Sequence, residues 1–371
     1  MKPFGSRELV GEVISKDLCI GCGACQELCP YFRSYKGKTA MLFACSKDEG
    51  RCFAYCPKVE VDLDTLSQTY YDKAYDTCPL GRYLSIGIAR AGERAGKASF
   101  QSGGTVSALM QYALERKIID GTILTARDDL MPVPQIVTIP EDVLSFASSK
   151  YTAAPTLSAL NRAVKDGRKR LGVVSTPCQA VAVAQMRSNP MAVEAFADPI
   201  ALVIGLFCTW SLDYRAFTAF LEERLPGATI LKIDIPPPPA EVMVVVTDGG
   251  TVEFPLADIR KLIPETCSYC IDMTSEFSDI SVGVVEGRPD WNTIICRTAR
   301  GQQIVDEAAK DGWLILEALP AENLDHLLWA AGNKKRRALV KGIANGLVRP
   351  QGQDGFSCLR LNKVVLDEIT I

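Results

Sequence analysis

Fourteen cysteines against a single histidine, His326, set the limits on this 371-residue chain. The first four cysteines, Cys19, Cys22, Cys25 and Cys29, have the spacing C-x2-C-x2-C-x3-C, and a proline follows the last of them. Thiolates spaced in this way on a glycine-containing loop converge on three corners of an iron–sulfur cubane, and the fourth cysteine points to a second cluster. The segment is therefore predicted to form an iron–sulfur module.

A second set of cysteines completes this module. Cys45 and Cys52 follow, and Cys56 is again followed by a proline, which repeats the C-x3-C-P closure. The first cluster is assigned to four cysteines of the two runs: Cys19, Cys22, Cys25 and Cys56. A zinc knuckle is the alternative, but zinc sites use two C-x2-C pairs rather than four cysteines in one run.

Three cysteines are left for the second cluster: Cys29, Cys45 and Cys52. The fourth cysteine of the repeat is missing, and Asp48 and Glu49 stand in its place. We expect Asp48 to be the fourth ligand. A cluster of only three irons, or a ligand from Cys78, is the alternative.

Two more cysteines stand at the ends of predicted strands. Residues 171–175 form an apolar strand that ends just before Cys178, and a helix is expected over residues 180–186. Residues 200–207 are apolar enough for a buried parallel strand, which ends at Cys208. Because ligands in open α/β sheets bind outside the carboxyl ends of adjacent strands, the two thiols are expected to meet in one crevice.

A C-x2-C pair, Cys267 and Cys270, follows a predicted hairpin over residues 242–254. Together with Cys178 and Cys208, this pair is expected to complete a third 4Fe-4S cluster. Cys296 and Cys358 are interpreted as buried structural thiols, because free cysteine is among the most buried residue types.

Composition excludes several other classes of function. Hydrophobic residues make up 47% and charged residues 23% of the chain, as in ordinary globular proteins, and the formal charge of −3 disfavours binding to nucleic acid. The N-terminal residues lack the apolar core of a secretory signal, and no transmembrane helix is expected. We therefore expect a cytoplasmic chain with reduced thiols, free or peripheral on a membrane complex.

The order of apolar and turn segments predicts a mixed α/β fold. We expect a ferredoxin-like module in residues 1–80, a mostly parallel α/β body in residues 81–320 and a helical tail in residues 321–371. Within the body, further strands are predicted at 121–126, 279–285 and 291–297, and helices at 108–117, 140–147 and 155–164.

Two loops of the body have the composition of phosphate sites. The first precedes the helix over residues 108–117 and offers backbone N–H groups and hydroxyls through Gln101, Gly103, Gly104, Thr105 and Ser107. The second offers a cation, hydroxyls and an aromatic ring through Ser149, Lys150, Tyr151 and Thr152. Helix capping for the first loop and contact with solvent for the second are the alternatives.

Five motifs of the body, taken in order, resemble the beta-subunit family of coenzyme F420 hydrogenases and dehydrogenases. They are Ser175-Thr-Pro-Cys-Gln, Gly205-Leu-Phe-Cys, Cys267-x2-Cys270-Ile-Asp, Ser278-Asp-Ile-Ser-Val-Gly and Trp291-Asn-Thr-x3-Arg297-Thr. The resemblance runs from about Ala98 to Gly312. With the N-terminal module, the chain is most similar to the F420H2 dehydrogenase input subunit and to formate dehydrogenase beta subunits.

This resemblance implies a bound FAD, a 4Fe-4S cluster on the four body cysteines, and exchange of a hydride with coenzyme F420. The family's flavin-contacting segments match the two loops above together with Thr176, Asp279 and Ser281. Arg297 adds positive charge for the phosphates of a dinucleotide. A flavin between a hydride carrier and one-electron clusters also explains why the chain needs no catalytic histidine.

The expected partner is a redox subunit of a hydrogenase, formate dehydrogenase, heterodisulfide reductase or membrane dehydrogenase complex. Two alternatives stay open: the same architecture with NAD(P)H or ferredoxin in place of F420, and an electron-relaying subunit without a substrate of its own. The chain lacks a clear G-x-G-x-x-G fingerprint, which favours F420. A basic run at residues 333–337 predicts either a docking surface or a solvated helix face.

Overall fold

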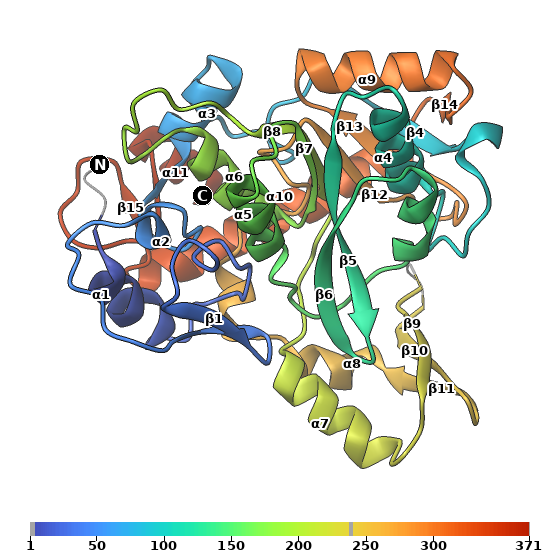
Figure 1. Ribbon diagram of the computed structural model, residues 1–371, viewed down its shortest axis with the longest axis horizontal. Coiled ribbons are helices and arrows are strands. Elements are labelled where there is room, and N and C mark those ends of the chain that lie inside the picture. Colours follow the sequence, from blue (N-terminus) through green and yellow to red (C-terminus); the bar gives the residue numbers. More distant parts are fainter. Residues whose placement is uncertain (1–3, 237–239, 371) are drawn as a thin grey trace.

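The computed structural model describes residues 4–236 and 240–370. Its body is built on an eight-stranded sheet with the order β14-β4-β13-β12-β8-β7-β5-β6 (Figure 1). The strands are β4 (Ser85–Ala91), β5 (Gly121–Asp128), β6 (Met131–Val137), β7 (Leu171–Ser175), β8 (Ile200–Leu206), β12 (Ile280–Val284), β13 (Asn292–Cys296) and β14 (Leu314–Glu317).

The four central strands β5, β7, β8 and β12 run parallel to one another. The outer strands β6, β13, β4 and β14 pair antiparallel with their neighbours. The chain passes between parallel strands through helices, as βαβ connections require. The predicted mixed α/β fold, with parallel strands at its centre, is confirmed.

Helices cover both faces of this sheet. On one face lie α4 (Thr105–Glu115) and α9 (Ala299–Lys310), and on the other α5 (Thr156–Lys165) and α6 (Pro177–Arg187). The side chains of β8 alternate accordingly: Leu202 packs on the α4 side and Val203 on the α5 side. The helix predicted at 140–147 is a 3-10 segment instead, η3 (Glu141–Phe146), and it ends where the backbone at Ala147 leaves the helical conformation.

A smaller layer projects from the lower part of the body in Figure 1. Three antiparallel strands with the order β11-β10-β9 pack against a helix around Phe217, Met243 and Phe254. The elements are α7 (Tyr214–Arg224), β9 (Ile230–Asp234), β10 (Val242–Thr247), β11 (Gly250–Pro255) and α8 (Leu256–Ile259), followed by the 3-10 segments η4 (Arg260–Leu262) and η5 (Glu265–Tyr269).

The N-terminal module packs directly on the body. Its elements are α1 (Ser6–Leu9), the π-helical η1 (Val10–Ile14), β1 (Phe32–Tyr35), β2 (Lys38–Met41), α2 (Arg51–Ala54), β3 (Val61–Asp62) and α3 (Leu63–Tyr71). Gly23 has φ +82°, and a Cβ there would lie 2.7 Å from the carbonyl oxygen of Pro155. Asn161 of α5 donates to the carbonyls of Ala24 and Gln26 at 3.0 and 2.8 Å. The cysteine loop is therefore fixed against α5 through its backbone.

The C-terminal segment joins the module to the body (Figure 1). Besides the helices α10 (Ala321–Ala344) and α11 (Lys363–Thr370), it contains two short strands, β15 (Val348–Pro350) and β16 (Leu359–Leu361). β16 pairs in parallel with β3 of the N-terminal module, so the tail is not purely helical. No helix of the described ranges is long and apolar enough to cross a bilayer.

The basic run on α10 is divided between the interior and the solvent. Lys334 and Lys335 are 7% and 1% exposed, whereas Arg336 and Arg337 are exposed. Both predictions for this run, a docking surface and a solvated helix face, are therefore wrong for the two buried lysines. The ammonium of Lys335 lies 2.9 Å from a carboxylate oxygen of Glu276 and donates to the Tyr75 hydroxyl at 2.9 Å, which secures α10 to the body.

Replacing Lys335 with methionine should lower the free energy of unfolding by about 3–5 kcal/mol, because the Glu276 carboxylate would stay buried without its cationic partner. The matched change Lys261→Met removes an exposed lysine that pairs with Asp258 and should cost less than about 1 kcal/mol. Anaerobic denaturant titrations would measure both values. Equal losses in the two variants would contradict a structural role for the buried pair.

Candidate functional site

The first cysteine group is brought together inside the N-terminal module. Cys19, Cys22 and Cys25 lie on the loop between η1 and β1, and Cys56 follows α2. Burial raises the pKa of the Cys22 thiol well above its usual value, and the neighbouring Cys56 raises it further. Burial and then Cys19 raise the pKa of Cys25 to about 12. The four thiols are thus close enough to influence one another.

The second group contains Cys29, Cys45 and Cys52. Burial raises the pKa of Cys52 to about 11, and the charges of Cys29 and Cys45 add to this shift. Asp48 lies on the same loop as Cys45 and is exposed to solvent. Cys78 packs elsewhere, beside Leu80 in the body. Asp48 as the fourth ligand stays a prediction.

The third group forms where the parallel strands end. Ser175 at the end of β7 pairs with Gly205 near the end of β8, so Cys178 and Cys208 leave the sheet side by side. Burial raises the pKa of Cys178 to about 11, with further increases from Cys270 and Cys267. Burial also raises the pKa of Cys208, and the other three thiols act on it in the same direction.

The donor chemistry of the three groups fits iron–sulfur clusters. A buried thiol with a raised pKa is neutral in the free protein and becomes a thiolate when it binds a metal. Within the described part of the chain, no three Cys, His, Asp or Glu side chains converge on the position of one metal ion. A cubane does not require such convergence, because each of its four thiolates binds a different iron.

The first and third groups are neighbours across the interface between module and body. Cys178 is among the thiols that raise the pKa of Cys22. Between the groups lies Lys58, a buried lysine that donates to the carbonyl of Thr266 at 3.2 Å. Burial raises the pKa values of Cys178 and Cys267, and the charge of Lys58 offsets part of this rise. Sequence reasoning missed Lys58, although its position two residues after Cys56 placed it close to the first group.

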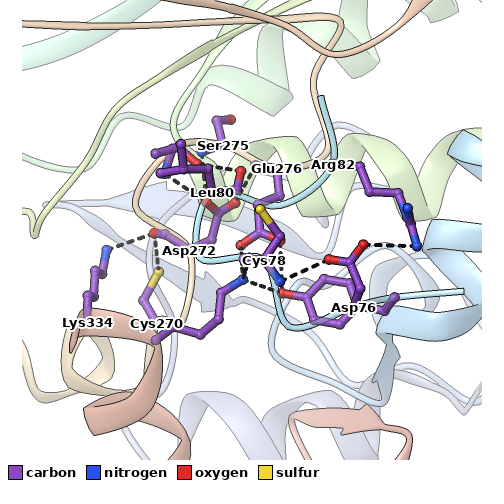
Figure 2. Close-up of polar contacts among 12 residues, drawn as sticks. Asp76, Cys78, Leu80, Arg82, Cys270, Asp272, Ser275, Glu276 and Lys334 are labelled. Atoms are coloured by element: carbon purple, nitrogen blue, oxygen red, sulfur yellow. Dashed lines mark hydrogen bonds and ion pairs between the residues drawn. The ribbon is translucent and has the colours of Figure 1, made fainter. Parts of the chain in front are cut away.

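A second cation borders the third group from α10. Lys334 donates to the carbonyl of Cys208 at 2.7 Å. It also donates to the carbonyl of Asp272 at 2.8 Å (Figure 2). Burial alone would lower its pKa, but Cys270 and Cys208 shift it above the usual value. In the sequence, Lys334 is part of the basic run of α10. Such a run indicates a surface feature, so the pattern alone does not predict that Lys334 lies beside the third group.

The two predicted phosphate loops meet next to the third group. The Gln101 amide donates to the Tyr151 hydroxyl at 3.1 Å, and its oxygen accepts from the Ser149 backbone at 3.2 Å. Thr152 forms an isolated parallel bridge with Leu212, just beyond Cys208. The loop over residues 149–152 therefore runs beside the segment that carries one of the four thiols.

The glycine-rich turn before α4 packs tightly against β4 and the loop before β13. A Cβ on Gly103 would lie 3.0 Å from the carbonyls of Ala89 and Asp290, and Gly104 has φ +74°. The Thr105 hydroxyl is buried and donates to the Ala89 carbonyl at 3.1 Å. Ser107, in contrast, is partly exposed on the first turn of α4.

Asp279 and Ser281 do not face the two loops. Both are buried, at 4% and 0% exposure. The Asp279 carboxylate accepts from the backbone of Val203 and the hydroxyl of Thr298, each at 2.8 Å. Thr176, in contrast, caps α6, and its hydroxyl lies 3.3 Å from the Cys178 sulfur, so this predicted flavin contact borders the third group.

Arg297 is also held in the interior, at 2% exposure. A guanidinium has five N–H donors. Those of Arg297 are bonded to the Ser281 hydroxyl, the carbonyls of Leu80 and Arg82, and the carbonyl and hydroxyl of Thr274. Arg297 thus holds the loop before β12 against residues 80–82 by hydrogen bonds. Its guanidinium is fully bonded within the protein and does not face a phosphate in this structure.

Lys150 is the cation that the structure does place at the loops. Its ammonium donates to the carbonyls of Phe146 and Ser148 at 2.9 and 3.0 Å. Burial, and then the nearby Arg127, lower the pKa of Lys150 to about 8. Two neighbouring cations of this kind favour an anionic ligand.

Replacing Cys208 with serine should remove one cluster, about a third of the iron and acid-labile sulfide of the anaerobic protein. Three full cubanes give about twelve irons per chain, and a three-iron second cluster gives about eleven. The control variant is Cys296→Ser, because Cys296 is buried but packs in the core on the α4 and α9 face of the sheet, away from the three cysteine groups. Equal iron loss in both variants, or stoichiometric zinc with little sulfide in the native protein, would contradict the assignment.

Comparison with known proteins gives a consistent result. Residues 12–31 match the 4Fe-4S binding domain family. Residues 88–161 and 168–322 match the N-terminal and C-terminal families of the coenzyme F420 hydrogenase/dehydrogenase beta subunit, respectively. The two beta-subunit matches together cover more than half of the chain.

Individual relatives agree with these matches. The coenzyme F420 hydrogenase subunit beta of Methanococcus voltae is 33% identical over 253 residues, which is 67% of this chain and 87% of that protein. An F(420)H(2) dehydrogenase subunit of Methanosarcina mazei is 28% identical over 80% of this chain and 84% of its own length. A chain of the F420-reducing [NiFe] hydrogenase complex from Methanosarcina barkeri has a TM-score of 0.65 at 28% identity, covering 72% of this chain and 93% of that one. The chain belongs to the coenzyme F420 hydrogenase/dehydrogenase beta-subunit family, and its N-terminus is a 4Fe-4S binding domain.

Proposed function

We propose that this protein is the F420-linked subunit of an oxidoreductase complex, with FAD in the body and iron–sulfur clusters on its three cysteine groups. The observation that carries the proposal is the position of the third group. Cys178 and Cys208 lie at the carboxyl edge of β7 and β8, where open α/β sheets bind their ligands. The loop over residues 149–152 runs beside this edge.

FAD, when bound, would supply the exchange between a two-electron hydride carrier and one-electron centres. The residues that would hold it are those of the two adjoining loops, including Gln101, Ser149 and Tyr151, which already fix one another by hydrogen bonds. Lys150 would neutralise phosphate charge. Thr176 would contact the flavin from the N-cap position of α6, beside Cys178.

The three cysteine groups are arranged in the order third, first, second. Cys178 of the third group acts on Cys22 of the first, and Cys52 of the second group acts on Cys25 of the first. When clusters are bound, this order would lead single electrons between the body and the outer edge of the module, with Asp48 as a ligand of the outermost cluster.

A partner subunit would bind at this outer edge. Leu42 and Phe43, which precede Cys45 by three and two residues, are 53% and 64% exposed. Exposed apolar side chains beside a redox group favour a protein contact, because isolated monomers rarely leave such patches open. The relatives named as hydrogenase and dehydrogenase subunits support the same assignment.

Lys150→Met should weaken FAD binding to the flavin-free protein by about tenfold near pH 7, since a hydrogen bond to a charged group contributes on the order of 1.5–3 kcal/mol. In the unmodified protein, affinity should be highest below pH 8, where Lys150 is protonated, and should fall as the pH rises above about 8. Calorimetric titration with FAD at several pH values tests this, and Lys165→Met, an exposed lysine on α5, is the matched control. A pH dependence that survives Lys150→Met would rule out this role.

The function itself is tested with anaerobic, FAD-reconstituted protein and an artificial one-electron dye. Reduced F420 should bleach the flavin and reduce the dye, and removal of FAD should abolish dye reduction while the iron content stays unchanged. Rapid flavin bleaching by NADH, with none by reduced F420, would show that the substrate is a nicotinamide coenzyme and not F420. Absence of bound flavin after reconstitution would favour the alternative function, an electron-relaying subunit without a substrate of its own.

A further inference from the structure

The ammonium of Lys334 occupies an unusual place for a lysine. It extends from α10 into the interior and ends between two segments that carry cysteines of the third group, as Figure 2 shows for Cys270. One hydrogen bond goes to the carbonyl of Cys208 itself, at 2.7 Å. The other goes to the carbonyl of Asp272, two residues after Cys270, at 2.8 Å.

The carboxylate of Asp272 does not compensate this charge by direct contact. Its two oxygens accept from the backbone N–H groups of Thr274, Ser275 and Glu276 at 2.8 to 2.9 Å. Among the described residues, Lys334 forms no ion pair with any carboxylate, whereas the adjacent Lys335 pairs with Glu276. Lys334 is therefore a buried cation that donates its hydrogen bonds to neutral carbonyls.

A buried ammonium is costly unless negative charge lies close by. The groups that interact electrostatically with Lys334 are the thiols of Cys270 and Cys208, the carboxylate of Asp272 and the thiol of Cys267. The thiols become thiolates when they bind a metal. A cluster held by four thiolates is anionic, and it gains one further negative charge on reduction. A fixed cation beside it stabilises the reduced form more than the oxidised form, and net charge is one of the factors that set cluster potentials.

We propose that Lys334 is a positioning residue that holds the Cys208 and Cys270 segments together and raises the reduction potential of the cluster on the third cysteine group. The inference rests on the proposed function, because it requires a cluster at this group. Sequence position separates Lys334 from its two carbonyl partners by more than sixty residues, so the effect arises only from the packing of α10 against the body.

The test compares three substitutions by anaerobic potentiometric titration followed by electron paramagnetic resonance. Lys334→Gln keeps a hydrogen-bond donor without the charge, Lys334→Met removes both, and Lys334→Arg keeps the charge. The signal of the third cluster is identified as the one lost in Cys208→Ser. Arg337→Gln, which removes an exposed charge from the same helix, is the matched control.

In both neutral variants, the ratio of reduced to oxidised third cluster at a fixed potential should fall about tenfold, which is about 59 mV for a one-electron couple. The arginine variant, the Arg337→Gln control and the other clusters of each variant should keep their potentials. Loss of the third cluster from both neutral variants, with retention in Lys334→Arg, would also support a charge requirement.

Two results would overturn the inference. An unchanged potential in Lys334→Gln, with a change only in Lys334→Met, would assign Lys334 to hydrogen bonding rather than charge. Loss of iron in all three variants would leave a purely structural role. If Cys208→Ser removes no cluster signal at all, the proposed function fails instead, so the two failures are distinguishable.

Discussion

The burial of thiols at the junction of three segments is the constraint on which the rest of this structure depends. Cys178 and Cys208 leave adjacent parallel strands, and Cys267 and Cys270 reach them from η5. Burial raises the pKa values of Cys178 and Cys208, so in the absence of metal these thiols are neutral and weakly bonded. The cluster proposed for this group would replace these neutral thiols with metal–thiolate bonds, and its binding free energy would add to the stability of the packing between module, body and tail.

The packing of the N-terminal module shows how this coupling is built. Gly23 allows the cysteine loop to approach the backbone at Pro155, and Asn161 holds the loop by two carbonyls. At the other end of the chain, β16 pairs with β3 shortly after the last cysteine of the module. The module is thus fixed from both sides, which keeps the first group next to the third. A flexibly linked module would not maintain that order.

Features that depend on local pattern could be predicted from the sequence. The strand ends at Cys178 and Cys208 could be located because apolar runs and a proline mark them, and parallel strands bring such ends together. Arg297 could not be interpreted correctly from its charge, because its partners Leu80, Arg82 and Thr274 come from distant parts of the chain. The identity of the fourth ligand of the second group depends on side-chain placement near Asp48, which no spacing rule specifies.

The two buried lysines of α10 also could not be interpreted correctly from the sequence pattern. As a sequence, the run at 333–337 is a single basic patch, but consecutive residues on a helix point in directions about 100° apart. Lys335 therefore enters the body beside Glu276 and Tyr75, while Lys334 reaches the carbonyls next to the third cysteine group. Within residues 4–236 and 240–370, Lys335 has a carboxylate partner and Lys334 has none. One helix thus supplies a structural ion pair and a second buried cation that lies beside the third cysteine group.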